Sequence, residues 1–248
     1  MKQQTKRHTL SPSQMRTSKS SRRQFMSLGG KVLAGSVLAG VALNRIHAAE
    51  DNTIRLALVG CGGRGSGAAG DALSSTAGPT KLVAMADVFE DKQTRSYKAL
   101  SEQFGEKVDV PPERRFLGFD AYRKAIDCLR PGDVMIQATH SAFRPMHVEY
   151  AIDKGVNVFM EKSFAPDPGG TRRILRIAEA AEKKNLKIGC GLMCRHSSAR
   201  QDLIQKIRDG AMGSIKLIRA YRMDPGARMG PYPGGQSDLL WLIRQPYF

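Results

Sequence analysis

Short apolar runs alternate with stretches of helical periodicity from Ile54 onward. The apolar runs read IRLALVG, KLVAMADV, DVMIQAT, VNVFMEK and LKIGCGLM, with a weaker one at RRFLGF. Polar or amphipathic stretches separate them, and the one at 169–185 places Ile174, Ile177, Ala178 and Ala181 on one helical face. Continuous apolar strands separated by helices are typical of a parallel sheet covered on both faces. We therefore expect an α/β fold with a doubly wound parallel sheet.

The first apolar run leads directly into a glycine-rich stretch that matches G-x-G-x-x-G. In a strand-to-helix turn, the first glycine permits the tight turn and the second lets backbone N–H groups reach a pyrophosphate. The third lets the helix pack closely on the strand, and the helix N-terminus favours phosphate. The stretch predicts dinucleotide binding, although a glycine-rich turn in another α/β fold is the alternative. The residues concerned are Gly60, Gly62, Gly63, Arg64 and Gly65.

Asp87 ends the second apolar run, 22 residues after Gly65. A carboxylate at this place accepts hydrogen bonds from the ribose hydroxyls of the adenosine half of a dinucleotide. It would repel a 2′-phosphate, so the pattern favours NAD over NADP. A helix-capping role is the alternative interpretation of Asp87.

Charge and cysteine content exclude some classes of function. The formal net charge is +16, but residues 1–50 hold nine of the 39 Lys and Arg and one of the 23 acids, which leaves 30 basic and 22 acidic residues, or +8, for the rest. No basic run is interleaved with aromatic residues, which argues against nucleic-acid binding. The cysteines lie in or beside apolar segments without zinc-site spacing, so we expect buried free thiols rather than a metal site or a disulfide framework. They are Cys61, Cys128, Cys190 and Cys194.

Residues 1–50 resemble an export signal. The stretch SRRQFM, with Arg22 and Arg23, is similar to the twin-arginine motif, and small residues follow at 48–49. The uninterrupted apolar run Val32–Leu43 has twelve residues, fewer than the roughly 17–25 that span a bilayer. We expect a signal peptide and leader at 1–50, a periplasmic protein, and the twin-arginine translocase as a partner. An ordinary secretion signal, a disordered basic tail and an uncleaved anchor are the alternatives.

Later stretches resemble the Gfo/Idh/MocA family of sugar and inositol dehydrogenases. They read VGCGGRG, MADV, IQATHSAFRPMHVEYAIDKGVNVFMEK, GCGLMCRHS and IRDGAMGSI, and cover about Ile54 to Arg222. Ser163 departs from the family, which usually has proline after Glu-Lys. The resemblance implies an NAD-binding Rossmann domain at 51–193 and the beginning of a substrate domain with an open mixed sheet at 194–248. We expect that domain to continue beyond the given sequence.

The stretch after the last apolar run is expected to lie outside the parallel sheet. SSARQDLIQKIRDGAMG predicts a helix closed by Gly210. SIKLIRAYRMD alternates apolar and polar residues and predicts a strand of a different, half-exposed sheet. Residues 224–235 are rich in glycine and proline and predict a loop.

The resemblance also implies roles for Glu161 and Lys162. It places Lys162 at the junction of nicotinamide and substrate and Glu161 near the nicotinamide ribose. From the residues alone, Lys162 lies at the carboxyl end of a predicted strand, where ligands bind in open α/β sheets, and an amine beside a cationic nicotinamide suits proton exchange with a hydroxyl. A solvated lysine paired with Glu161 is the alternative. Family catalysis adds an Asp and a His from the second domain, which we expect beyond Phe248.

Other polar residues lie at predicted strand ends. Thr139 and His140 are expected to line the cofactor, with a catalytic acid role for His140 as a weaker alternative to packing at the strand end. His147 is expected to be structural, in the first turn of a helix. Arg195 and His196 follow a later strand. They are expected to border the substrate site, with a structural role as the alternative.

Three functions fit this sequence. The first is an exported, homo-oligomeric, NAD-dependent oxidoreductase that acts on a hydroxyl of a sugar, inositol or related polyol and holds its cofactor tightly. The second is an NAD-dependent glycoside hydrolase that oxidises a sugar transiently. The third is a non-catalytic sugar-binding or assembly protein on the same fold. A retained cofactor that sugars reduce would separate the third from the other two, and release of an aglycone would identify the second.

Overall fold

The computed structural model of the chain describes residues 52–221, 223, 230–232, 234–235 and 237–245. The signal peptide and leader predicted at 1–50 lie outside these residues, as does part of the loop predicted at 224–235. The domain boundary predicted between residues 193 and 194 stays a prediction.

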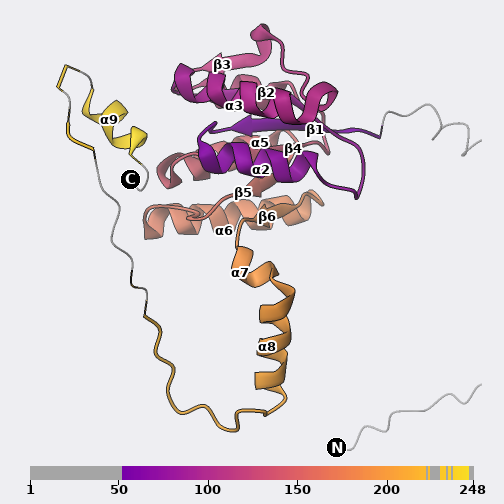
Figure 1. The fold of residues 1–248 in the computed structure, drawn as a ribbon, viewed down its shortest axis with the longest axis vertical. Coiled ribbons are helices and arrows are strands. Elements are labelled where there is room, and N and C mark those ends of the chain that lie inside the picture. The colour runs from indigo at the N-terminus through magenta and orange to yellow at the C-terminus, as the bar shows by residue number, and fades with distance from the viewer. Residues whose placement is uncertain (1–51, 222, 224–229, 233, 236, 246–248) are drawn as a thin grey trace, which may run out of the picture. The chain divides into compact units, whose positions relative to one another are not determined.

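Six parallel strands form one sheet in the order β3-β2-β1-β4-β5-β6 (Figure 1). This confirms the predicted doubly wound parallel sheet. The strand order reverses between β1 and β4, and open α/β sheets bind ligands outside the carboxyl ends of the strands at such a reversal. The strands are β1 Ile54–Val59, β2 Thr80–Asp87, β3 Arg115–Leu117, β4 Val134–Gln137, β5 Asn157–Met160 and β6 Ile188–Cys190.

Helices cover both faces of the sheet. Leu56 and Leu58 of β1 belong to one buried cluster, with residues of α2 (Gly63–Leu73) and α3 (Glu90–Phe104). Ala57 and Val59 of the same strand belong to the other, because successive side chains of a strand point to opposite faces. That second cluster includes residues of α4 (Ala121–Asp127), α5 (Arg144–Asp153) and α6 (Pro168–Lys183). Short 3₁₀ helices lie at Gly105–Lys107, Pro112–Arg114 and Ser141–Phe143.

The predicted apolar face of α6 is correct except at one position. Ile174, Ile177 and Ala181 are buried against the sheet, whereas Ala178 is exposed. Asp167 caps the helix, since its Oδ1 accepts a hydrogen bond from Gly170 N–H at 2.7 Å. Because Ala178 is exposed, the buried stripe of α6 is narrower than the sequence pattern predicted.

Among the residues described after the sheet, three helices form: α7 (Met193–His196), α8 (Ser198–Arg208) and α9 (Asp238–Arg244). The helix predicted before Gly210 is confirmed, and Gly210 follows it with φ +90°. The strand predicted after it is wrong, because residues 214–221 form neither helix nor strand. A strand needs a neighbour for its backbone hydrogen bonds, and none of the described residues provides one there.

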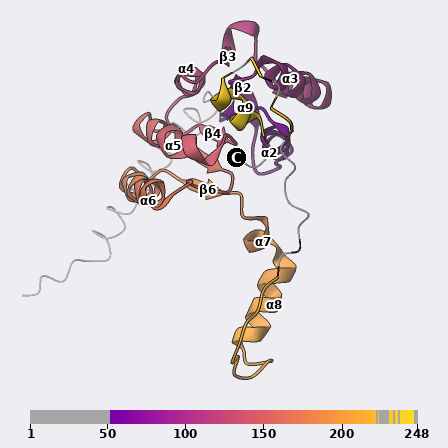
Figure 2. The same ribbon diagram turned by 90° about the vertical axis from the view of Figure 1, so that its left-hand side faces the viewer.

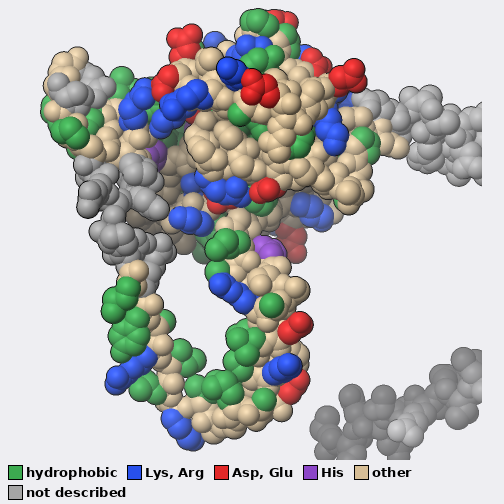
Figure 3. Space-filling model, viewed as in Figure 1, with side chains coloured by type: hydrophobic (Ala, Val, Ile, Leu, Met, Phe, Trp, Pro, Cys, Tyr) green, Lys and Arg blue, Asp and Glu red, His purple; other side chains and the backbone are tan. Residues whose placement is uncertain are grey.

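Large apolar side chains are exposed in this part of the chain, and Figure 3 shows them in its lower part. They are Leu203, Ile204, Met212, Ile215, Leu217, Ile218, Tyr221 and Met223. No helix among the described residues is both long enough and apolar enough to cross a membrane.

The cysteines are free, but only Cys61 is buried. Cys128 and Cys190 are partly buried and Cys194 is exposed, so the expectation of four buried thiols is wrong for these three. Cys194 is exposed because it lies on α7, outside the two layers of helices that cover the sheet.

Candidate functional site

A cavity of about 620 Å³ opens at the carboxyl edge of the sheet. This volume lies within the roughly 300–1,000 Å³ of small-molecule sites. Its wall combines the glycine loop at 60–66, the end of β2 with the start of α3, the connection from β4 to α5, and Ile243 to Gln245. The cavity thus brings together the predicted glycines, Asp87, Thr139 and His140.

The glycines of the loop are needed for two different reasons. Gly60 has φ +97°, and a Cβ there would lie 2.8 Å from backbone atoms of Ala138 and Thr139. A Cβ on Gly65 would lie 1.9 Å from the carbonyl oxygen of Gly60. The protein's own backbone therefore excludes side chains at these two positions. A Cβ on Gly62, in contrast, would meet no atom within 4 Å.

The start of α2 fits the pyrophosphate of a dinucleotide. The helix begins at Gly63, and Gly62 at its N-cap supplies no side-chain cap. No acidic residue lies in the first turn. An uncapped helix N-terminus offers N–H groups and a positive dipole end to an anion. The open space at Gly62 lets a ligand approach that backbone.

Asp87 ends β2 and faces the glycine loop. Its Oδ2 accepts a hydrogen bond from Cys61 N–H at 2.6 Å, and its Oδ1 accepts one from Phe89 N–H at 2.9 Å. The N-cap residue of α3 is Phe89, so Asp87 does not cap that helix in the way the alternative supposed. A carboxylate has about four acceptor sites, which leaves room for ribose hydroxyls.

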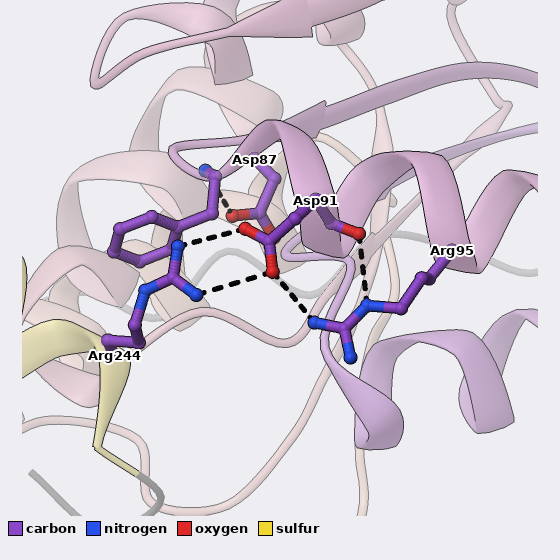
Figure 4. A network of polar contacts seen from close by, with 5 residues as sticks. Asp87, Asp91, Arg95 and Arg244 are labelled. Atoms are coloured by element: carbon purple, nitrogen blue, oxygen red, sulfur yellow. Dashed lines mark hydrogen bonds and ion pairs between the residues drawn. The ribbon is translucent and has the colours of Figure 1, made fainter.

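A charged network lies beyond Asp87, at the start of α3 (Figure 4). Arg244 donates from Nη2 to Asp91 Oδ1 at 2.8 Å and from Nη1 to Oδ2 at 3.2 Å. Its guanidinium carbon lies 4.2 Å from the centre of the Phe89 ring. Arg95 also donates to Asp91 Oδ2, at 2.7 Å. The hydrogen bonds from Arg244 lower the pKa of Asp91, so this carboxylate is charged at neutral pH.

Arg64 of the glycine loop reaches Glu161 at the end of β5. Its Nε and Nη2 each lie 2.8 Å from Glu161 Oε1. Glu161 is 4% exposed, and a Cβ on Gly191 would come within 2.5 Å of its Oε1. The absence of a side chain at Gly191 therefore makes room for the buried carboxylate. The two predicted cofactor residues Arg64 and Glu161 are thus paired with each other.

Lys162 is the second residue after β5, at the carboxyl edge of the sheet, as the sequence predicted. Its side chain is exposed and does not line the cavity of about 620 Å³. The peptide bond between Lys162 and Ser163 is cis. The role of Lys162 in proton transfer stays a prediction.

A buried arginine joins the ends of β4 and β5. Arg144 is 6% exposed, and its Nε and Nη2 donate to the carbonyl oxygen of Thr139 at 2.9 and 2.6 Å. Its Nη1 donates to the carbonyl oxygens of Glu161 and Ser163. Burial lowers the pKa of Arg144 to about 10, and the nearby Glu161 opposes this shift. The guanidinium therefore stays charged and fixes the backbone on both sides of Lys162.

His140 and His147 both lie at this edge of the sheet but have different surroundings. His140 Nε2 lies 3.0 Å from the carbonyl oxygen of Ile243, so the residue packs against the C-terminal segment. His147 lies in the cavity wall and stacks on Tyr122 with ring centres 4.0 Å apart. Burial, with Arg123 nearby, lowers the pKa of His147 to about 3. A neutral, stacked imidazole is consistent with the structural role predicted for His147.

Arg195 and His196 lie on α7 and are exposed. His196 Nε2 lies 3.3 Å from the carbonyl oxygen of Cys190, and the carbonyl oxygen of Arg195 accepts a hydrogen bond from Gln201. Neither residue lines the cavity. Their place beside a substrate stays a prediction.

Sequence reasoning missed Arg144, Asp91 and Arg244. Arg144 is a single arginine ahead of Pro145, and nothing in the neighbouring sequence indicates its three carbonyl partners. Arg244 and Asp91 are 153 residues apart, so no spacing rule joins them. The whole of α9 was unpredicted, although DLLWLIR is a short apolar run.

Solved structures with a similar fold include inositol dehydrogenases and a 3-ketoreductase. A myo-inositol 2-dehydrogenase from Lactobacillus plantarum is 21% identical with a TM-score of 0.52, over 66% of this chain and 43% of that one. A 3-ketoreductase from Actinomadura kijaniata, solved with NADP, is 20% identical with a TM-score of 0.50, over 66% of this chain and 45% of that one.

A scyllo-inositol dehydrogenase from Lactobacillus casei, solved with NAD(H) and scyllo-inositol, is 23% identical over 65% of this chain and 43% of that one, with a TM-score of 0.49. The chain thus spans less than half the length of these structures. No family model and no curated protein sequence matches it. The comparisons show the fold: the chain has the α/β Rossmann-like fold of NAD(P)-binding oxidoreductases.

Proposed function

We propose that the protein is a nicotinamide-dependent oxidoreductase that acts on a hydroxyl of a sugar, inositol or related polyol and prefers NAD. The observation that carries this proposal is the glycine cradle at Gly60–Gly65, which opens into a cavity with Asp87 on its wall. A protein that binds only a sugar would need neither an uncapped helix N-terminus in the glycine turn nor a carboxylate at the end of β2 placed for a ribose. The likeness in fold to inositol and sugar oxidoreductases supports the same class of reaction.

Each residue has a separate task in this proposal. The nicotinamide, when bound, supplies the hydride acceptor. Backbone N–H groups at Gly62 to Arg64 hold the pyrophosphate, and Asp87 accepts hydrogen bonds from the adenosine ribose. Lys162 Nζ exchanges a proton with the substrate hydroxyl, while Arg144 fixes the backbone on both sides of it.

Cofactor preference tests the role of Asp87. Trp241 is the only tryptophan of the chain and lies on α9, so quenching of its fluorescence by NADH or NADPH follows binding. Replacing Asp87 with Ala should weaken NADH binding about tenfold, because hydrogen bonds to a charged group are lost, and should relax discrimination against NADPH. Asp109→Ala removes a carboxylate paired with Arg114 away from the cavity and should change neither. Preference of the parent for NADPH would refute the ribose assignment, and absence of any dinucleotide binding would refute the proposal.

Turnover tests the role of Lys162. We expect Lys162→Ala to bind NADH within a few-fold of the parent and to lose about 100-fold or more in turnover on a panel of inositols and sugars, the size of a general acid–base contribution. Lys183→Ala, which removes an exposed lysine of α6, is the control. Near-normal turnover of the Lys162 variant would leave the lysine with a structural role.

We also propose that residues 1–50 direct export of the folded, cofactor-loaded protein by the twin-arginine pathway. The support is the Arg22-Arg23 motif, followed by an apolar run too short to span a bilayer. Free NAD is expected to be scarce outside the cytoplasm, so an exported oxidoreductase has to retain its cofactor. Denaturing protein purified from the periplasm should release a nicotinamide dinucleotide, whereas an empty protein or one that remains in the cytoplasm would contradict the idea.

A further inference from the structure

The C-terminal segment contacts both sides of the cavity opening. On one side, Arg244 binds Asp91 through two hydrogen bonds and lies over the Phe89 ring, just after β2. On the other, the carbonyl oxygen of Ile243 lies 3.0 Å from His140 Nε2, after β4. Since β2 and β4 are the two neighbours of β1, the segment connects the loops on either side of the glycine turn. Figure 2 shows α9 in front of this edge of the sheet.

The same segment forms part of the cavity wall. Ile243, Arg244 and Gln245 line the cavity together with the glycine loop and Asp87. Ile243 is 6% exposed although its helix has only seven residues, so its side chain is held against the site. A ligand seated on the glycine loop would therefore have α9 as a neighbour.

The charge pattern suits a dinucleotide below this segment. Asp91 would repel phosphate if it were unpaired, but Arg244 and Arg95 both neutralise it. Lys92 also lines the cavity, where burial lowers its pKa and Asp87 opposes that shift. The two carboxylates at this end of the site are thus balanced by three cations.

We propose that α9 is the outer wall of the dinucleotide site and that Arg244, held by Asp91 and Phe89, is a residue that retains the cofactor. This inference rests on the proposed function. Release of the cofactor then requires the contacts of Arg244 and Ile243 to break, so removing these contacts speeds release. The opposite possibility is that α9 occupies the place of the cofactor and blocks its entry.

Dissociation kinetics distinguish these possibilities. The chain is loaded with NADH and chased with excess NAD, and loss of energy transfer from Trp241 reports release. We expect Arg244→Gln to release NADH about fivefold faster than the parent and to bind it more weakly. This is the size of effect expected for a half-exposed ion pair with good geometry. Asp91→Asn should give a similar rate of release. The double variant should add nothing further, since both changes break the same contact, that between Arg244 and Asp91.

One further variant tests the apolar contact of α9, and another controls for general charge effects. Ile243→Ser weakens the apolar contact rather than the ion pair and should also speed release. Lys98→Gln removes an exposed charge from the same helix as Asp91, outside the cavity, and should leave release unchanged. Added salt should speed release from the parent more than from Arg244→Gln, because salt screens the ion pair.

The outcomes separate the two proposals. A parent that binds no NADH refutes the proposed function. A parent that binds NADH and releases it at the same rate as Arg244→Gln and Ile243→Ser refutes the retaining wall while leaving the proposed function intact. Faster association and tighter binding in these variants would show that α9 blocks the site instead.

Discussion

The sheet region at 54–190 and the segment at 198–223 both contain many apolar residues, but only the first buries them. The strands from β1 to β6 place their side chains in two buried clusters under five helices. In the second region, α8 forms and residues 214–221 form no strand, while most of the large apolar side chains that the structure describes there are exposed. A helix satisfies its own backbone hydrogen bonds, whereas a strand depends on a neighbour. Apolar periodicity therefore predicts a helix more safely than a lone strand.

The largest expected effect lies in the sheet region, at Gly65. We expect Gly65→Ala to lower the free energy of unfolding by about 3 kcal/mol or more, because the new methyl group would overlap the carbonyl oxygen of Gly60. Urea unfolding measures this change. Gly63→Ala is the matched control in the same turn, since its Cβ would meet no atom within 4 Å and alanine favours a helix. Equal stability of both variants would show that the loop can relax around a side chain at position 65.

The next largest effect concerns Arg144, which joins two strand ends. Arg144→Lys keeps the charge but cannot serve the carbonyl oxygens of Thr139, Glu161 and Ser163 together. Leaving buried carbonyl groups without donors should cost about 2–3 kcal/mol of unfolding free energy, again measured with urea. Arg95→Lys, at an exposed pair within α3, should cost less than about 0.5 kcal/mol. A loss for Arg144→Lys as small as that of the control would mean that water replaces the missing donors.

The sequence predicted the parts of the fold that depend on local patterns. The apolar runs that alternate with helical stretches predicted the parallel sheet. The glycines at 60, 62 and 65 predicted the turn that lines the cavity. What it could not predict depends on distant partners. The pairing of Arg64 with Glu161 joins residues 97 positions apart, and that of Arg244 with Asp91 joins residues 153 apart. The strand predicted at SIKLIRAYRMD failed for the same reason, since its pattern carries no information about a neighbouring strand.

An intermediate effect is expected from pH, through His147. The pKa of His147 is about 3 in the folded protein, below its ordinary value of 6.5, so the unfolded chain binds a proton first as pH falls. This contribution to stability is complete above pH 6.5 and is lost as pH falls toward 3, by about 1.4 kcal/mol per pH unit. His147→Phe keeps an aromatic ring against Tyr122 and should remove that slope. Urea titrations of parent and variant at pH 7, 6 and 5 measure it, and parallel curves would show that folding does not lower the pKa of His147.

The smallest effect is expected in the second region, at Ile218, which is 78% exposed. Replacing it with Ser removes an apolar side chain that contributes little burial, so the free energy of unfolding of this chain should change by less than about 0.5 kcal/mol. Leu58→Ser makes a comparable change in polarity at a fully buried position of β1 and should cost several kcal/mol, because a buried hydroxyl lacks partners and leaves a cavity. Urea unfolding of both variants compares the regions directly. A loss of 2 kcal/mol or more at Ile218, on the order of a buried aliphatic side chain, would mean that residues 198–223 pack against a partner in solution. The apolar side chains of both regions would then be buried, those of the sheet region within the chain and those of the second region against another molecule.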